Sequence, residues 1–536
     1  MRAWILALAV GCTGDKEEIV DSGEPVETTA ICPDGSGDAR FAALAETIEA
    51  ERLALGATAM AVAVVTDGEL AWCGGFGQRH PADGGTVDGE TLFRMGSVNK
   101  MMTAVAVLQQ VEAGELSLDA AVTETIPGFT MALDPRYTDM TGQDLLTHQG
   151  AFYDYLEIDS NHEDEALEEA VEDWFDEGMV LLAPPGVFWN YSNPNWYVAG
   201  RMVEVLDGRS YVSYMDEAVF DPLGMTRTGY DADFMLADGN YAVGETSDWT
   251  GQSAGTVYAG PDSYDNAWAR PAGYAWTSAR ELVTFGQFLL DGDPTVLSDD
   301  LREEMLTTQV DLEILDGSFQ GYGYGLFVDQ GIYDNEGAWR PLGVTSHGGD
   351  INGFAADLFL VPEHGFAIAV LAAGDGAHLS DSILEAIEAF VPMPEAIEGP
   401  DLTVDPSIFS DYAGHYAEPW GITGEFSVSV GEKGELQAIF PLLDEVAIPY
   451  ESELISYIPD NFIYTVQGYA MLMTFMRDDS GEVTYARTRL FVGERDADVS
   501  AQRSSQAVDP ARLSALLKEQ GPPLRSLSRP PLPESL

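Results

Sequence analysis

The sequence predicts an α+β fold, in which an antiparallel sheet flanked by helices and carrying a helical subdomain precedes a small all-β C-terminal domain. Two observations predict the first part: strand patterns lie at both ends of residues 1–395, and helical patterns fill the middle. One antiparallel sheet built from both ends explains this order without a long parallel crossover. The third observation is a series of short alternating segments, separated by Gly, Asp and Ser turns, over residues 408–500.

The first predicted elements are a helix and a hairpin. Residues 41–55 have a helical pattern that ends at Gly56. Residues 60–65 form the continuous apolar run of a buried strand, and the turn at 66–69 leads to a partner strand at 70–73. This hairpin supplies the N-terminal part of the sheet.

The inserted helices follow. Helical patterns cover residues 97–113, 163–178, 197–206 and 279–290. The first ends before Gly114, a residue that suits the left-handed conformation after a helix. The second is strongly acidic, which is typical of a solvated face.

A second hairpin and a last helix complete the predicted sheet domain. Residues 353–361 and 366–371 read as two strands joined by a turn, and residues 380–390 form the helix. A Pro-rich stretch from 391 then separates this domain from the β segments. We expect a lipoprotein-type signal peptide at 1–12, an acidic tether at 13–38, the sheet domain at 39–395, a β-barrel-like domain at 396–505, and a tail at 506–536 that contains a short helix at 510–518.

The N-terminus has the pattern of an export signal. Arg2 precedes the apolar residues 5–10, and Gly11-Cys12 resembles a bacterial lipobox in which Cys12 is the lipidated first residue of the mature chain. Ala9 stands where that pattern prefers leucine. We expect an exported lipoprotein of the cell envelope, on its periplasmic or outer surface, with ordinary cleavage and a non-exported start as the alternatives.

The other two cysteines, Cys32 and Cys73, leave two alternatives open. An exported protein permits a disulfide between them, but two cysteines in a sequence define no geometry.

The charge of the chain excludes several partners. It has 25 Lys and Arg against 90 Asp and Glu, a formal net charge of −65. Such a protein repels nucleic acid and anionic membranes, so we expect membrane contact only through a lipid on Cys12. Scarce lysine with abundant acid also suggests adaptation to high salt, where charges are screened over about 3 Å. We expect no metal and no cofactor, since we find no His/Cys cluster and no phosphate-binding loop, and nothing predicts an oligomeric state.

The most informative motif is Ser97-Val-Asn-Lys100, at the start of the first inserted helix. The chain has four lysines, so a lysine three residues after a serine at this place stands out. Residues three apart share a helix face, and Ser97 Oγ and Lys100 Nζ are therefore expected to meet. A serine beside an amine is the start of a nucleophilic site.

Two further segments carry polar groups that fit the same chemistry. Asn190-Tyr191-Ser192-Asn193 precedes a helix, and Ser346-His347-Gly348-Gly349-Asp350 leads into a strand. In this order the three segments resemble the class C-like branch of the serine β-lactamase and D-alanyl-D-alanine peptidase superfamily. That branch carries Ser-x-x-Lys, Tyr-x-Asn, and Lys-Thr-Gly or His-x-Gly. Further similar stretches lie at 114–119, 145–148, 221–225 and 322–325.

The resemblance covers residues 40–395 and implies a β-lactamase/transpeptidase-like fold; residues 412–416 resemble the start of the β-barrel that many members carry. It implies that Ser97 is the acylated nucleophile, with Lys100 or Tyr191 as its base. Asn193 would contact Lys100 and the substrate amide. His347 and Gly349 would line the substrate, and the backbone N–H groups of Ser97 and Asp350 would form an oxyanion hole.

Several residues depart from the family pattern. His347 replaces the lysine of most β-lactamases, Gly348 removes a hydroxyl that would bind a carboxylate, and Asp350 adds a negative charge. These changes argue against strong β-lactamase activity. We interpret His148 as structural, and Tyr322 and Tyr324 as packing or pocket-wall residues.

The sequence thus predicts an exported serine hydrolase that acts on a small-molecule or peptide substrate. The bond is an ester or amide, in a D-amino-acid peptide or a small carboxylic ester. The alternatives are a penicillin-binding, sensor-like protein with little turnover, a β-lactamase, and an inactive scaffold whose β domain binds ligands.

Overall fold

The structure is a computed structural model that describes residues 32–81, 84–154, 161–247, 256–259, 266–312, 320–417, 425–478, 480–488, 492–496 and 527. The predicted signal peptide, with Cys12, and the predicted helix at 510–518 lie outside the described residues. Of the predicted tether, residues 32–38 are described. None of the helices in the described part combines the length and the apolar character needed to cross a membrane.

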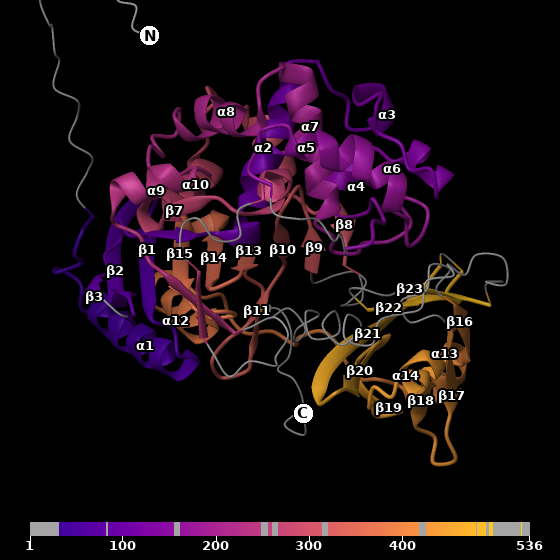
Figure 1. Cartoon of the computed structure of the whole chain (residues 1–536). Coiled ribbons are helices and arrows are strands. Elements are labelled where there is room, and N and C mark those ends of the chain that lie inside the picture. The colour runs from indigo at the N-terminus through magenta and orange to yellow at the C-terminus, as the bar shows by residue number, and fades with distance from the viewer. Residues whose placement is uncertain are drawn as a thin grey trace, which may run out of the picture.

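The predicted α+β fold is confirmed (Figure 1). Within the described residues the main sheet has nine strands, and the central ones come from both ends of the domain. In spatial order the strands are β3 (Gly84–Thr86), β2 (Glu69–His80), β1 (Ala59–Thr66), β15 (Phe366–Ala373), β14 (Phe354–Val361), β13 (Val344–Ile351), β10 (Phe327–Asp329), β9 (Gln320–Tyr322) and β8 (Val310–Asp311).

The two predicted hairpins pair in the centre of this sheet. β1 lies antiparallel to β15, with Val62 opposite Val370, and β15 pairs in turn with β14. Side chains of β1 alternate between two faces: Met60 and Val64 belong to the apolar core on one face, and Ala61 to the core on the other. Both faces are covered, which explains why the strand is apolar throughout.

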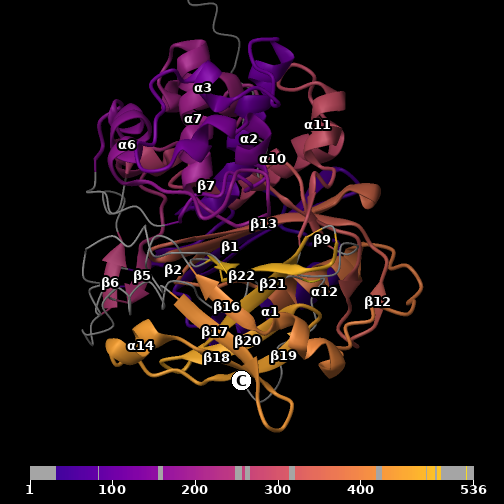
Figure 2. The same ribbon diagram turned by 90° about the vertical axis from the view of Figure 1, so that its right-hand side faces the viewer.

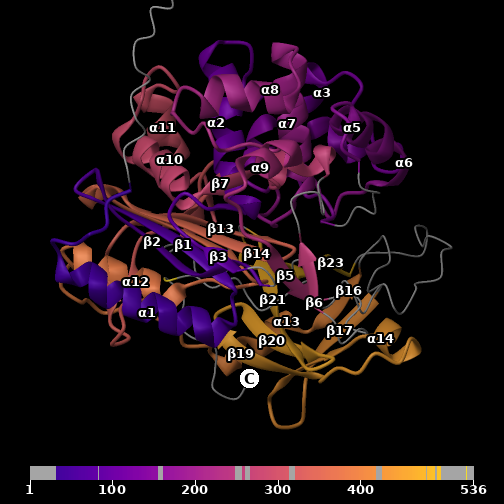
Figure 3. The ribbon, with the colours of Figure 1, turned by 60° about the vertical axis from the view of Figure 1, so that its left-hand side comes forward.

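Helices cover the two faces of the sheet separately (Figure 3). One face packs on α1 (Ala39–Leu55) and α12 (Ser380–Phe390). The other packs on α10 (Ala279–Asp291), beyond which lie α2 (Asn99–Glu112) and α7 (Pro194–Asp207). The smaller helices of this side are α3 (Val122–Thr125), α4 (Gly142–Leu146), α5 (Ala166–Glu168), α6 (Phe175–Gly178), α8 (Tyr211–Met215), α9 (Ala232–Asp238) and α11 (Asp299–Met305). The predicted acidic helix is α5 and α6 with a π-helical turn between them.

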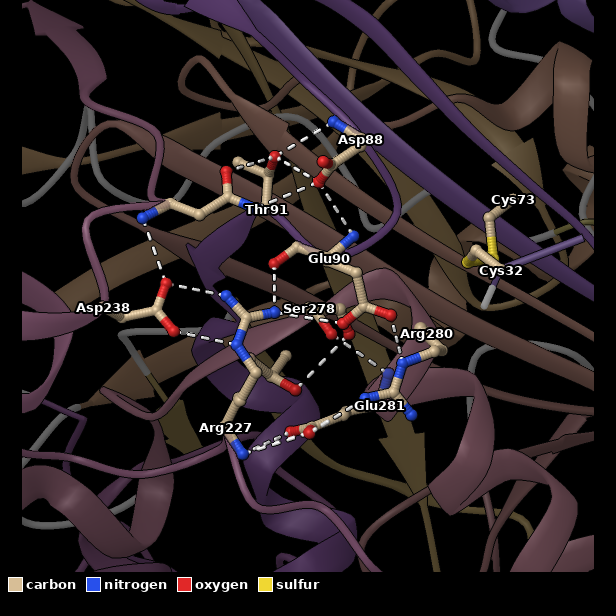
Figure 4. A network of polar contacts seen from close by, with 12 residues as sticks. Cys32, Cys73, Asp88, Glu90, Thr91, Arg227, Asp238, Ser278, Arg280 and Glu281 are labelled. Atoms are coloured by element: carbon tan, nitrogen blue, oxygen red, sulfur yellow. Dashed lines mark hydrogen bonds and ion pairs between the residues drawn. A yellow bond between two sulfur atoms is a disulfide. The ribbon is translucent and has the colours of Figure 1, made fainter. Parts of the chain in front are cut away.

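A buried polar network anchors the start of α10 (Figure 4). Ser278 caps the helix by accepting the N–H of Glu281. The Glu281 carboxylate, fully buried, accepts the hydroxyl of Thr228 at 2.7 Å and the N–H of Arg227 at 3.0 Å. Ser278 ends β7 (Trp276–Ser278), which pairs with β4 (Leu92–Arg94) directly before the Ser97 motif. The network therefore supports the segment that leads to the candidate nucleophile.

A disulfide joins Cys32 to Cys73 on β2, with the two Cα atoms 5.7 Å apart (Figure 4). Of the two alternatives that the sequence left open, the structure has the bonded one. The bridge fixes the segment before α1 to the sheet.

The C-terminal domain is a closed antiparallel barrel (Figure 2). Its strands are β16 (Gly414–Ala417), β17 (Glu425–Val430), β18 (Leu436–Ile439), β19 (Glu453–Ile458), β20 (Asn461–Val466), β21 (Tyr469–Arg477), β22 (Val483–Arg487) and β23 (Val492–Arg495). These strands lie in the region of short alternating segments, 408–500, that the sequence predicted to be all-β. The barrel lies beneath the main sheet (Figure 2), and Ile458 of β19 packs in one apolar cluster with Tyr322 of β9.

Candidate active site

Ser97 lies in a short 3₁₀ turn, Gly96–Val98, directly before α2. The sequence suggested that Ser97 belongs to the helix itself, and the structure corrects this. A 3₁₀ turn has three residues per turn, so it still places residues three apart above one another. Ser97 Oγ and Lys100 Nζ are 2.8 Å apart.

Lys100 is fully buried and has three oxygen neighbours. Its Nζ lies 2.8 Å from Ser97 Oγ, 2.8 Å from Asn193 Oδ1 and 2.7 Å from the carbonyl oxygen of Ala272. The amide and carbonyl oxygens can only accept hydrogen bonds. Of these three partners, only Ser97 can therefore exchange a proton with the amine. A neutral Lys100 would donate to the two fixed acceptors and direct its lone pair at Ser97.

The Tyr191 segment is positioned from two sides. The N–H of Asn193 donates to Asp154 Oδ1 at 2.7 Å, and the N–H of Ser192 donates to His148 Nδ1 at 3.0 Å. The His148 ring also lies 4.3 Å from the Tyr191 ring, centroid to centroid. His148 thus has the structural role expected of it. The Lys100 amine lies 5.1 Å from the centroid of the Tyr191 ring.

His347 is held as a neutral imidazole. Its Nδ1 lies 2.5 Å from the Gly348 carbonyl, so Nδ1 carries the proton, and Nε2 can accept from the Tyr322 hydroxyl at 3.3 Å. Burial, together with the charge of Lys100, lowers the pKa of His347 to about 3. Tyr322 is also fully buried, which raises the pKa of its hydroxyl and keeps it a donor. The sequence predicted that Tyr322 is a packing or pocket-wall residue. In the structure it also orients His347.

Glycines allow β13 to approach the nucleophile turn. A Cβ at Gly349 would lie 2.1 Å from the Met95 carbonyl oxygen and 2.9 Å from Ser97 N. A Cβ at Gly96, whose φ is +51°, would lie 2.9 Å from Asp350 N. Any larger residue at these two positions would force the segments apart. The backbone amides of Ser97 and Asp350 therefore belong to two segments in direct contact.

The Asp350 side chain is part of a three-residue cluster. His378 Nε2 lies 2.9 Å from Asp350 and His378 Nδ1 lies 3.0 Å from Asp357, on β14. Ionised carboxylates only accept, so with both acids ionised each ring nitrogen donates and His378 is an imidazolium. The charge of Asp357 is the main cause that raises the pKa of His378 to about 11. The sequence indicated a negative charge at Asp350, and the structure pairs this charge with His378.

Aromatic side chains form one wall of the site, and the barrel contributes to it. Trp189, Tyr191 and Tyr322 pack in one apolar cluster with Leu312 and with Ile458 from β19. Tyr324 contacts Glu304 instead. The site is therefore built from both domains.

The structure thus brings together all the residues that the sequence singled out. Ser97, Lys100 and Asn193 form one hydrogen-bonded group, Tyr191 and His347 have ring centroids 6.2 Å apart, and Gly349 and Asp350 border the nucleophile turn. Ala272, Asp154 and His378 had no sequence signal, because a single carbonyl, aspartate or histidine far along the chain is not a motif. A serine beside an amine, with convergent backbone amides, is suited to acyl transfer.

The fold and sequence of this chain are similar to those of known proteins. The model of the beta-lactamase family matches residues 44–389. Penicillin-binding protein 4 of Amycolatopsis lactamdurans is 29% identical over 352 residues, which cover 63% of this chain and 88% of that protein. Esterase EstB of Burkholderia gladioli is 32% identical over 214 residues, covering 36% of this chain and 51% of the esterase. The structure of D-amino acid amidase from Ochrobactrum anthropi SV3 is similar with a TM-score of 0.55 at 20% identity, over 65% of this chain and 98% of the amidase.

Proposed function

Because the chain belongs to the beta-lactamase family, we propose that it hydrolyses an ester or amide through an acyl-enzyme on Ser97. It is a hydrolase of the β-lactamase fold, related to penicillin-binding proteins and esterases. The observation that carries the proposal is the 2.8 Å contact between Ser97 Oγ and a buried lysine amine. The proposed substrates are D-amino-acid peptides and small carboxylic esters.

In the acylation step, Lys100 accepts the Ser97 proton while Ser97 Oγ attacks the acyl carbonyl. Asn193 and Ala272 hold the amine, so its lone pair stays directed at the serine. The backbone N–H groups of Ser97 and Asp350 stabilise the oxyanion, by about 3–4 kcal/mol for each donor. This scheme takes Lys100 as the base, and Tyr191 is the alternative base.

Tyr191 has a second role in the scheme, since it lies between Lys100 and His347. It transfers the proton onward to the leaving group. Water then attacks the acyl-enzyme, and Ser97 recovers its proton as the acid is released.

The charges at β13 support the choice of substrate. His347 is neutral and Gly348 has no hydroxyl, so neither provides the cation or the donor that an anionic β-lactam would need. The carboxylate of Asp350 repels anions, although His378 offsets part of its charge. By charge, neutral esters and amides are therefore favoured over β-lactams and over peptides that end in a free D-Ala carboxylate.

We also propose that the protein is exported and anchored in the cell envelope through a lipid on Cys12. The N-terminal pattern supports this, and the Cys32–Cys73 disulfide suits an oxidising compartment. Incorporation of labelled palmitate into the wild type, and its loss in Cys12→Ser, would be the expected result. Equal labelling of the two proteins would contradict it.

The activity itself is tested with a panel of substrates for the wild type and Ser97→Ala. The panel comprises p-nitrophenyl acetate, a chromogenic cephalosporin, peptides that end in D-Ala-D-Ala, and peptides that begin with a D-residue. We expect turnover of an ester or a D-peptide, little turnover of the cephalosporin, and no turnover by the variant. Full activity of Ser97→Ala on every substrate would make the nucleophile assignment wrong. A burst without turnover would favour the sensor-like alternative.

A further inference from the structure

Arg487 is a buried cation of the barrel that contacts the sheet domain. It ends β22 and is 5% exposed. Its Nη1 donates to the carbonyl oxygen of Trp189 and lies 3.5 Å from Asn190 Oδ1. Its guanidinium carbon lies 5.4 Å from the centroid of the Trp189 ring. One side chain of the barrel thus binds both the backbone and the ring of Trp189.

Trp189 immediately precedes the motif that carries Tyr191 and Asn193. Its ring centroid lies 6.4 Å from that of Tyr191 and 5.9 Å from that of Tyr322. Tyr322 in turn contacts His347. A shift of Trp189 would therefore reach the Lys100 partner Asn193 through the backbone, and His347 through the packed rings.

Because of the residues that surround Arg487, we expect Trp189 to shift when the Arg487 side chain is replaced. Ile458 of the barrel packs in the same apolar cluster as Trp189, and Tyr485 of β22 packs on Phe188 with ring centroids 5.3 Å apart. These contacts around the charge-assisted hydrogen bond from Arg487 to Trp189 are apolar. Removing the Arg487 guanidinium would leave the buried Trp189 carbonyl without this donor. A buried polar group without a hydrogen-bond partner destabilises the folded state.

We infer that Arg487 is a positioning residue through which the barrel holds the 189–193 segment in its catalytic geometry. This rests on the proposed function, because the segment matters for activity only if Ser97, Lys100 and Tyr191 act as described. The barrel is then a required part of the hydrolase.

The test compares Arg487→Met with the matched control Arg495→Met in the full-length protein. Arg495, on β23, also donates to two backbone carbonyls, those of Val483 and Ala413, but both lie inside the barrel. With the ester that the wild type turns over, we expect Arg487→Met to lower kcat by ~10- to 100-fold. KM should change less. The kcat of Arg487→Lys, which keeps a cationic donor, should lie between those of Arg487→Met and the wild type. Arg495→Met should keep wild-type kcat.

Hydrogen exchange provides a readout that does not depend on catalysis. We expect the amides of residues 186–196 to exchange faster in Arg487→Met than in the wild type, and to be unchanged in Arg495→Met. Equal kcat and equal exchange in the two Met variants would overturn the inference. A loss of kcat in Arg487→Met would also overturn the inference if thermal unfolding of the whole protein accounted for that loss. Turnover that persists in Ser97→Ala would instead count against the proposed function, and the exchange result would still report on Arg487.

Discussion

The chemistry at the residue scale depends on how one amine is surrounded. Lys100 is buried, and two of its three oxygen neighbours, Asn193 Oδ1 and the Ala272 carbonyl, can only accept. The third is Ser97 Oγ. Of these three neighbours only Ser97 can exchange a proton with the amine, and the three-residue spacing places the lysine beside it.

Removing this amine should therefore abolish most activity. Lys100→Met keeps the length of the side chain and removes the base, and we expect kcat/KM for the preferred ester to fall by ~10²- to 10⁴-fold. Steady-state kinetics measures the loss, and a melting curve shows whether the variant is folded. A folded Lys100→Met with wild-type kcat/KM would assign the base elsewhere, and Tyr191→Phe would be the next variant to measure.

At the scale of elements, the site depends on how β13 is held. His378, in the loop between β15 and α12, bridges Asp350 on β13 and Asp357 on β14. The imidazolium thus joins two adjacent strands and the loop at the edge of the site. Since both carboxylates require a donor, the bridge exists only while His378 is protonated.

This bridge predicts a pH-dependent stability. The pKa of His378 is raised to about 11 in the folded protein, above its ordinary value of 6.5. A raised pKa stabilises the folded state fully below the unfolded pKa, and the stabilisation is lost as the pH rises toward the folded pKa. We expect His378→Gln to lower the free energy of unfolding by roughly 2 kcal/mol at pH 6, and by progressively less toward pH 10. Urea unfolding at several pH values tests this. A loss that is the same at every pH would contradict the imidazolium bridge.

The disulfide is the second link at this scale. It closes a loop between Cys32 and Cys73 with a sequence separation of 41 residues. Loop-closure entropy predicts a stabilisation of roughly 4 kcal/mol for such a loop. Cys32→Ser/Cys73→Ser should melt at a lower temperature than the oxidised wild type, and dithiothreitol should lower the melting temperature of the wild type only. Identical melting with and without the reductant would argue that the bond contributes nothing.

The whole molecule carries a formal net charge of −65, and much of it must repel itself. Salt screens such repulsion, over about 3 Å at 1 M. We therefore expect the melting temperature to rise between dilute buffer and molar NaCl. A melting temperature that stays constant or falls would show that the acidic surface is not an adaptation to salt.

The sequence could predict features that depend on neighbouring residues, but not contacts between residues far apart in the chain. Both hairpins and the Ser97–Lys100 pair depend on local patterns, so their spacing along the chain was sufficient. Ala272 and Arg487 are different: Ala272 is 172 residues from Lys100, and Arg487 is 298 residues from Trp189. Such contacts arise only when the insert, the sheet and the barrel pack together, and single residues leave no periodic signal.

All the proposed chemistry depends on an acyl-enzyme at Ser97, which intact-mass spectrometry can detect. Wild type and Ser97→Ala would be quenched in acid within seconds of mixing with p-nitrophenyl acetate, and then digested. We expect one added acyl group on the wild type, located on the peptide that contains Ser97, and none on the variant. Acylation of the variant, or an acyl group on another residue of the wild type, would contradict it.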